Sequence, residues 1–188
     1  GANASGDYST ALGSAANASS DAATALGRGA NALGPATTAL GVQASALGPS
    51  AIAVGFLANA TSNASTAVGK LANTAGGWAT ALGSNANAGR DFTIAVGSYA
   101  TASGNSSIAL GNQVSASSSS AIALGNYSNA SGLSAVALGE MANASGNFST
   151  AIGDSAKASE FGAVALGELA IATGNYSTVL GSEAFAKE

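Results

Sequence analysis

A glycine recurs every fourteen residues along this chain, without insertion or deletion. It first appears in the triplet Ala11-Leu12-Gly13, and its counterparts stand at 27, 41, 55, 69, 83, 97, 111, 125, 139, 153, 167 and 181. The two residues before each glycine are Ala or Val, followed by Leu, Ile or Val. A repeat this regular indicates that the chain folds as a series of near-identical units, each packed against its neighbours.

Within each repeat, small and large residues alternate with a period of two. We number the repeat from the recurring glycine, which is position 0. Positions 3 and 5 are almost always Ala, whereas positions 11 and 13 hold Thr, Ile, Val or Leu. Alternation with this period is typical of β-strands, and the Gly, Asn, Asp and Pro at positions 7 and 8 indicate turns. The sequence therefore predicts an all-β fold, a parallel β-solenoid whose equivalent strands stack from one 14-residue coil to the next.

An alanine-rich coiled coil is the competing interpretation, because fourteen residues equal two heptads and alanine favours helices. A glycine inside a helix costs about 1 kcal/mol. Here a glycine occurs in every repeat, often with a second one seven residues later. The charged residues that flank a coiled-coil seam are also missing, so we favour strands over helices.

The alternation must also be assigned a direction, because only one side of each strand faces the interior. We expect the large residues at positions 11 and 13 to point inward and to pack against the alanines at positions 3 and 5. Positions 10 and 12 then point outward, and their small side chains predict a flat apolar stripe where copies of the chain associate. The predicted interface stripe, at position 12, consists of Ala11, Ala25, Ala39, Ala53, Ala67, Ala81, Ala95, Ala109, Ala123, Ala137, Ala151, Ala165 and Val179.

The composition argues against several classes of function. The chain contains no Cys and no His, so the usual nucleophile–base pairs cannot form, and we expect neither enzyme activity nor a cofactor. Charged residues make up 7%, with a net charge of −4 and no basic stripe, which makes nucleic acid a poor partner. No segment approaches about 18 continuous apolar residues, so the sequence predicts no membrane-spanning helix.

Large apolar residues at positions 1 and 2 interrupt the pattern of small residues. Position 2 is out of phase with the inward alanines, so these side chains should face solvent. Exposed apolar clusters often contact partners. The predicted partner-binding patch consists of Phe56, Leu57, Leu71, Tyr99 and Tyr127.

A second set of aromatic residues stands at position 9, where a turn enters a strand. Their position next to the expected interface favours packing between copies of the chain, with ligand binding as the alternative. The set consists of Tyr8, Trp78, Phe92, Phe148 and Tyr176.

Three acidic residues, Glu140, Asp154 and Glu168, occupy position 1 of successive repeats. In a parallel solenoid their side chains would lie about 4.8 Å apart, the spacing of neighbouring strands. Such a ladder could hold a cation or form a solvated acidic edge. We predict the solvated edge and no metal site.

The segments 65–76 (Ser-Thr-Ala-Val-Gly-Lys-Leu-Ala-Asn-Thr-Ala-Gly) and 107–111 (Ser-Ile-Ala-Leu-Gly) resemble the head repeat of trimeric autotransporter adhesins, the YadA-like head. The resemblance spans residues 1–188, which we interpret as one array of about thirteen coils from a longer surface protein. It implies a left-handed parallel β-roll assembled as a homotrimer. It also implies display on the outer membrane of a Gram-negative bacterium, through a stalk and an anchor that this sequence does not contain.

For function, the resemblance implies an adhesin head that attaches a bacterium to its host through many weak, identical sites. The partners it implies are extracellular matrix proteins of the collagen, fibronectin or laminin class, or cell-surface receptors. The alternative is a structural spacer that projects a distal binding tip and binds nothing itself. Both interpretations remain open from the sequence.

Overall fold

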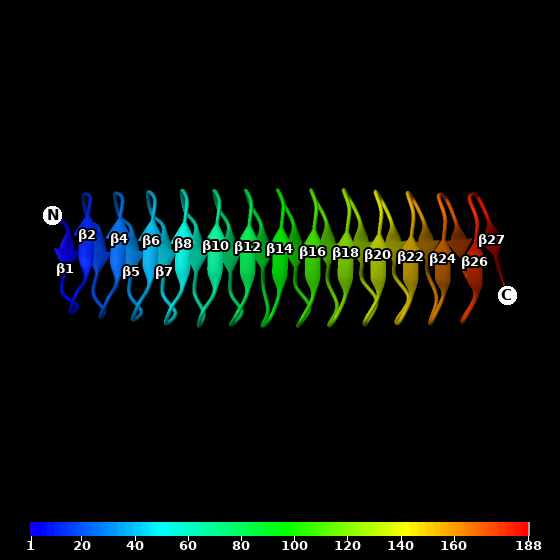
Figure 1. Cartoon of the computed structure of the whole chain (residues 1–188), viewed down its shortest axis with the longest axis horizontal. Helices are drawn as coiled ribbons and strands as arrows, with labels where there is room; N and C mark the ends of the chain where they lie inside the picture. The colour runs from blue at the N-terminus through cyan, green and yellow to red at the C-terminus, as the bar shows by residue number, and fades with distance from the viewer. Residues whose placement is uncertain (188) are drawn as a thin grey trace. The chain divides into compact units, whose positions relative to one another are not determined.

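The computed structural model describes residues 1–187 and confirms an all-β parallel solenoid built from 14-residue coils (Figure 1). Each coil has one two-residue strand at positions 4 and 5 and one three-residue strand at positions 11 to 13, joined by two turns. None of the residues from 1 to 187 lies in a helix. The alternation of small and large residues therefore predicts the secondary structure correctly.

The two-residue strands carry the odd numbers and the three-residue strands the even numbers. The odd-numbered strands are β1 (Asn3–Ala4), β3 (Asn17–Ala18), β5 (Asn31–Ala32), β7 (Ser45–Ala46), β9 (Asn59–Ala60), β11 (Asn73–Thr74), β13 (Asn87–Ala88), β15 (Thr101–Ala102), β17 (Ser115–Ala116), β19 (Asn129–Ala130), β21 (Asn143–Ala144), β23 (Lys157–Ala158), β25 (Ile171–Ala172) and β27 (Phe185–Ala186). The even-numbered strands are β2 (Thr10–Leu12), β4 (Thr24–Leu26), β6 (Thr38–Leu40), β8 (Ile52–Val54), β10 (Thr66–Val68), β12 (Thr80–Leu82), β14 (Ile94–Val96), β16 (Ile108–Leu110), β18 (Ile122–Leu124), β20 (Val136–Leu138), β22 (Thr150–Ile152), β24 (Val164–Leu166) and β26 (Thr178–Leu180).

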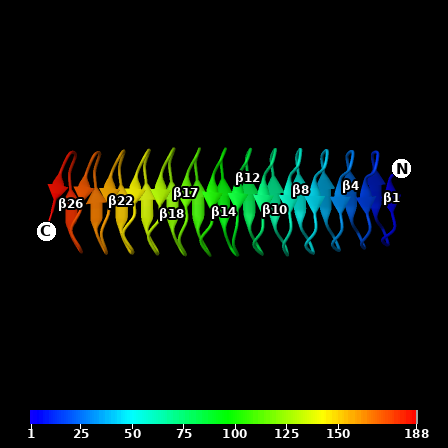
Figure 2. The ribbon, with the colours of Figure 1, turned by 180° about the vertical axis from the view of Figure 1, so that it is seen from behind.

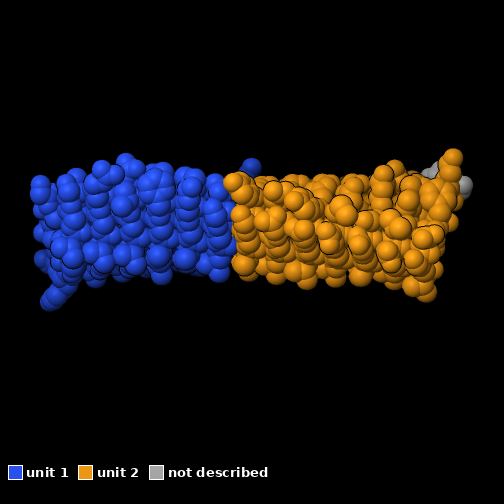
Figure 3. Space-filling view, turned by 90° about the horizontal axis from the view of Figure 1, so that it is seen from above, with its two compact units in different colours: residues 1–93 blue, residues 94–188 orange. Residues whose placement is uncertain are grey.

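The chain divides into two compact units, residues 1–93 and 94–188 (Figure 3). In each unit the odd-numbered strands form one parallel sheet and the even-numbered strands form a second, each in chain order. The even-numbered strands face the viewer in Figure 1, and Figure 2 shows the opposite side. Within each unit the register does not slip, because each strand residue pairs with its counterpart in the next coil, fourteen positions later, as Ala67 does with Ala81.

Small side chains fill the interior of every coil. Positions 3, 5, 10 and 12 point inward, and they are Ala in most coils, with Ser, Thr or Val in the others. Val114 is the largest fully buried side chain among residues 1–187. The expected inward orientation of positions 3 and 5 is confirmed. Since alanine faces alanine, the two sheets of each unit can approach closely.

The predicted orientation of the even-numbered strands is wrong, and with it the predicted interface stripe. The position-12 residues point into the coil, and positions 11 and 13 lie on the outer face. The eleven alanines at position 12 from Ala25 to Ala165 have no exposed surface, Val179 is 4% exposed, and Ala11, in the first coil, is partly buried. A fully buried side chain cannot contact another copy of the chain. The residues that are therefore not an interface stripe are Ala11, Ala25, Ala39, Ala53, Ala67, Ala81, Ala95, Ala109, Ala123, Ala137, Ala151, Ala165 and Val179.

The physical reason is the size of the coil. Most residues of a 14-residue coil lie in its two turns, so only two short strands enclose the interior. Such an interior has room for methyl and hydroxyl groups, so the strand phase that carries Ala, Ser and Thr faces inward. Position 10, the other small position that we expected on the outside, faces inward for the same reason. Thr37 and Thr93 at this position are fully buried.

Both turns pass through a residue in the left-handed backbone conformation. Positions 2 and 9 have φ between 50° and 67° throughout the described chain. This conformation suits Gly or Asn and is unfavourable for other residues. Nevertheless it is adopted by large residues such as Leu57, Trp78 and Tyr127, whose side chains project from the turns into solvent.

Position 0 needs glycine because neighbouring coils touch there. At Gly125, φ is 134°, and a Cβ atom would lie 2.2 Å from the carbonyl oxygen of Gly139 in the next coil. No side chain fits at that distance. The recurring glycine thus lets successive coils stack at the first turn.

Candidate binding surfaces

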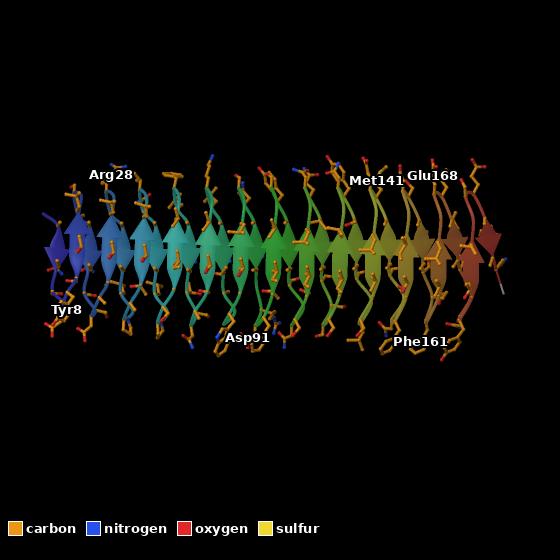
Figure 4. All side chains as sticks on the ribbon, in the orientation of Figure 1. Tyr8, Arg28, Asp91, Met141, Phe161 and Glu168 are labelled. Carbon is orange, nitrogen blue, oxygen red and sulfur yellow. The ribbon has the colours of Figure 1, made fainter. Side chains whose placement is uncertain are left out.

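Each unit has four outer surfaces, one on each sheet and one at each turn. We call them the aliphatic face (positions 11 and 13), the amide face (positions 4 and 6), the first turn edge (positions 1 and 2) and the second turn edge (positions 8 and 9). Figure 4 marks both edges, with Arg28, Met141 and Glu168 on the first and Tyr8, Asp91 and Phe161 on the second.

The aliphatic face carries ladders of Leu, Ile, Val and Thr. In the second unit, Ile108 pairs with Ile122, and Leu110 pairs with Leu124, which is 45% exposed. The in-register pairing places Leu, Ile or Val side by side at position 13 along the sheet of each unit, whereas position 11 varies between Thr and Ile or Val. A continuous ladder of exposed or partly exposed aliphatic side chains, as at position 13, is unusual on a protein that stays monomeric. It replaces the alanine stripe as the candidate contact surface between copies.

The amide face is polar over most of its length. Asn59 donates a side-chain hydrogen bond to Asn73 over 2.9 Å, and Asn73 donates another to Asn87 over 2.9 Å. Asn129 and Asn143 are linked in the same way in the second unit. These ladders run along the direction in which the coils stack, so they reinforce the register and leave a hydrated face.

The predicted partner-binding patch is exposed, as phase requires for its position-2 residues, and Phe56 at position 1 is exposed as well. Phe56 and Leu71 are 46% and 40% exposed, and Leu57 is also exposed. These three lie on adjacent coils, because the Leu71 N–H donates to the Phe56 carbonyl over 2.9 Å. Tyr99 and Tyr127 are exposed in the second unit, on coils separated by the one that carries Gln113. Binding by these five residues stays a prediction.

On the second turn edge of residues 1–93, Trp78 and Phe92 form an aromatic stack. Their ring centroids lie 5.3 Å apart and the planes are inclined by 5°. They are 56% and 57% exposed, so the stack lies on the surface.

The second turn edge of the other unit holds a cluster of three aromatic rings. Phe161 meets both Phe148 and Tyr176 edge to face, at centroid distances of 5.4 and 5.3 Å. Phe161 stands at position 8, and the search for large residues at position 9 missed it. The signal in the sequence is Gly162, a glycine at position 9 directly after Phe161. The structure gives the reason for this glycine, because a Cβ atom there would lie 2.9 Å from the Tyr176 ring.

The acidic residues divide into two groups. Glu140, Asp154 and Glu168 are exposed on the first turn edge, and residues 1–187 contain no group of three or more His, Cys, Asp or Glu that could hold a metal ion. Asp91 has a structural role, since its Oδ1 accepts the Gly77 N–H over 2.8 Å. Asp21 accepts the Asp7 N–H in the same way. We also find no helix in the described part of the chain that is long and apolar enough to cross a membrane.

Comparison with known proteins gives one family. A family model described as YadA head domain repeat (2 copies) matches residues 4–30, 32–51, 46–72, 79–100, 91–113, 102–128, 116–139, 130–156 and 158–184. Among solved structures, the collagen-binding domain of the Yersinia adhesin YadA is similar, with 28% identity over 80% of this chain and 68% of that chain and a TM-score of 0.39. No curated protein sequence matches. Because the family model accounts for most of the residues in both units, the chain belongs to the YadA head domain repeats of trimeric autotransporter adhesins.

Proposed function

We propose that this chain is the adhesive head of a homotrimeric protein on the outer membrane of a Gram-negative bacterium, where it binds host extracellular matrix. The adhesin-type role rests on the family match across both units. The large apolar side chains that the turns present to solvent are the observation that carries the binding role, because the solenoid does not need them. Equivalent turn positions in other coils hold small or polar residues such as Ala15, Ser50 and Gln113.

Assembly into a trimer is supported by the distribution of apolar residues. The interior buries mainly methyl groups, each of which contributes less than a buried Leu or Ile side chain. The Leu, Ile and Val residues of the aliphatic face contribute fully only when another surface covers them. Packing three aliphatic faces together would provide that cover and leave both turn edges of each protomer accessible. The number three follows from the family resemblance.

The first turn edge is the proposed matrix contact, centred on Phe56, Leu57 and Leu71. A trimer presents three copies of this patch, so weak individual contacts add up through avidity. Collagen, fibronectin and laminin are the ligand classes that the family resemblance implies. The patch suits such partners because it is apolar, exposed and flanked by the exposed Lys70.

The test is binding of the purified chain to immobilised collagen, fibronectin and laminin. The triple variant Phe56→Ser, Leu57→Ser, Leu71→Ser should lose most of the binding seen with the unmodified protein. Leu33→Ser with Leu47→Ser is the matched control, because both residues are exposed on the amide face of the same unit. Unchanged binding by the triple variant would exclude this patch. No binding of the unmodified protein to any of the three would support the spacer alternative instead.

A further inference from the structure

Trp78 and Phe92 differ from the other aromatic contacts of the described chain in their geometry. Their rings are parallel to within 5°, whereas Phe148, Phe161 and Tyr176 meet edge to face. A parallel stack keeps its outer ring faces flat and available, whereas rings that meet edge to face close on one another. We propose that the Trp78–Phe92 stack is a carbohydrate-binding platform for a neutral pyranose sugar, a site separate from the proposed matrix contact.

The fold does not require aromatic residues at these two positions. The equivalent residues in four other coils of the same unit have φ between 50° and 57°, the same conformation as Trp78 and Phe92. Those residues are Ala22, Ala36, Ser50 and Ala64. Two large rings more than half exposed gain little from burial, so their presence points to a contact outside the chain.

One face of the Trp78 indole remains uncovered by a large side chain. Phe92, on the following coil, stacks against one face of the indole. The preceding coil carries Ala64 at the same position, and the coil before that carries Ser50. A ring that stacks on Trp78 above Ala64 would occupy the next level of the solenoid, about 4.8 Å away. The unit therefore offers a place where a ligand ring continues the stack.

The polar surroundings suit a sugar. The C–H groups on the flat side of a pyranose carry partial positive charge and are attracted to the negative face of an aromatic ring. Its hydroxyl groups need both donors and acceptors, which the exposed Asn63 amide supplies on the coil that the ligand ring would cover. The exposed Arg90 and Asp91 lie on the coil of Phe92, on the other side of Trp78. The Asp91 carboxylate is held in place by the Gly77 N–H. Arg90 and Asp91 have opposite charges, which favours a neutral ligand over an ion.

A nucleobase could also stack on the platform, but nucleic acid is a poor fit. Single-stranded nucleic acid is held by aromatic stacking together with a positively charged groove along its backbone. Residues 1–93 contain three bases (Arg28, Lys70 and Arg90) and three acids (Asp7, Asp21 and Asp91), so the unit has no excess of positive charge. A neutral sugar does not need a positively charged groove.

The experiment uses the single tryptophan of the chain as a reporter. The assembled protein is titrated with maltotriose, cellotriose, chitotriose and galactobiose while Trp78 fluorescence is recorded, and saturation-transfer NMR on each sugar gives an independent readout. At least one sugar should give a saturable change at millimolar concentration. In Trp78→Ala with Phe92→Ala, the saturation-transfer signal should show affinity weakened about tenfold or more, as expected for a lost stacking contact. Phe148→Ala should bind as tightly as the unmodified protein.

Three results would overturn the proposal. The first is the absence of a saturable change with every sugar. The second is full saturation transfer in the double variant with circular dichroism unchanged. The third is a Trp78 emission that acrylamide cannot quench in the assembled protein, because the stack would then be covered by another copy. A response to a decaproline peptide and to no sugar would reassign the stack to peptide binding. Matrix binding is measured on the same preparations, so either proposal can fail while the other stands.

Discussion

Ala123 and Leu124 are neighbours in β18, and their side chains lie on opposite sides of the sheet. Ala123 has no exposed surface, whereas Leu124 is 45% exposed. The smaller side chain is inside because a 14-residue coil has little interior volume. The coil therefore places its larger apolar residues on the outside, where the proposed assembly of copies would bury them.

Enlarging an inward alanine should destabilise the solenoid. Ala109→Leu adds three carbon atoms where no exposed surface remains, and overpacking of this kind costs about 1–3 kcal/mol or more. Urea unfolding followed by circular dichroism should show a lower midpoint. Ile108→Leu, on the outer face of the same strand, is the control and should shift the midpoint little. An Ala109→Leu protein as stable as the unmodified one would mean that the interior has spare room.

Two glycines should respond very differently to a methyl group. Gly125→Ala places a Cβ atom 2.2 Å from the Gly139 carbonyl oxygen at a φ of 134°, so we expect backbone strain and overpacking to cost about 3 kcal/mol or more together. Gly29→Ala meets nothing closer than 3.5 Å, and Ala15 adopts a similar φ at the equivalent position. It should cost about 1 kcal/mol. Thermal unfolding of both variants gives the comparison, and equal losses would argue against the close approach of coils at position 0.

Buried hydroxyl groups at position 10 fall into two classes that mutation should separate. Thr37 donates to the Gly34 carbonyl over 2.6 Å, so Thr37→Val should lose about 1 kcal/mol. The buried Ser107 hydroxyl has no partner, so Ser107→Ala should leave stability unchanged or raise it slightly. Alanine already occupies this position in several coils, such as Ala121. Chemical denaturation measures both effects, and a destabilised Ser107→Ala would show that its hydroxyl has a partner in solution.

The asparagine ladder should contribute modestly to stability. Asn73→Ala removes hydrogen bonds to Asn59 and to Asn87, both partly buried, and should cost about 1 kcal/mol. Ser115→Ala changes the equivalent position on a coil without such a ladder and serves as the control. Hydrogen exchange at the backbone amides of β9 to β13 should be faster in Asn73→Ala. Identical exchange rates in the two variants would show that the asparagine ladder does not stabilise these strands.

The strands, the turns and the length of the coil follow from the sequence because they depend on local period. The alternation of small and large residues shows that successive side chains point to opposite faces of a strand, but it does not show which face is inside. We chose the larger residues, as in an ordinary hydrophobic core, and that choice failed at positions 11 and 13. The missed cue is a half-repeat, since Ala or another small residue stands at positions 3 and 5 and again seven residues later at positions 10 and 12.

The candidate sites were predictable to different degrees. Exposure of Leu57 and Leu71, at position 2, follows from their phase relative to the alanines at positions 3 and 5, which was assigned correctly. Phe56 stands at position 1, in the phase of those alanines, so its exposure does not follow from the alternation. The parallel packing of Trp78 on Phe92 could not be derived, because equal spacing in the sequence does not fix the side-chain torsion angles. Phe148 and Tyr176 are related to each other by the same repeat, yet Phe161 lies between them and produces an edge-to-face cluster.

Sedimentation equilibrium of the purified chain tests most directly whether the outward aliphatic face is an assembly surface. We predict a particle of three times the 17.5 kDa chain mass. The variant Leu124→Asp with Leu138→Asp, which puts charge on the aliphatic face alone, should sediment as a monomer while it keeps β-structure. A stable monomer of the unmodified chain, or an intact trimer of the double variant, would contradict the account.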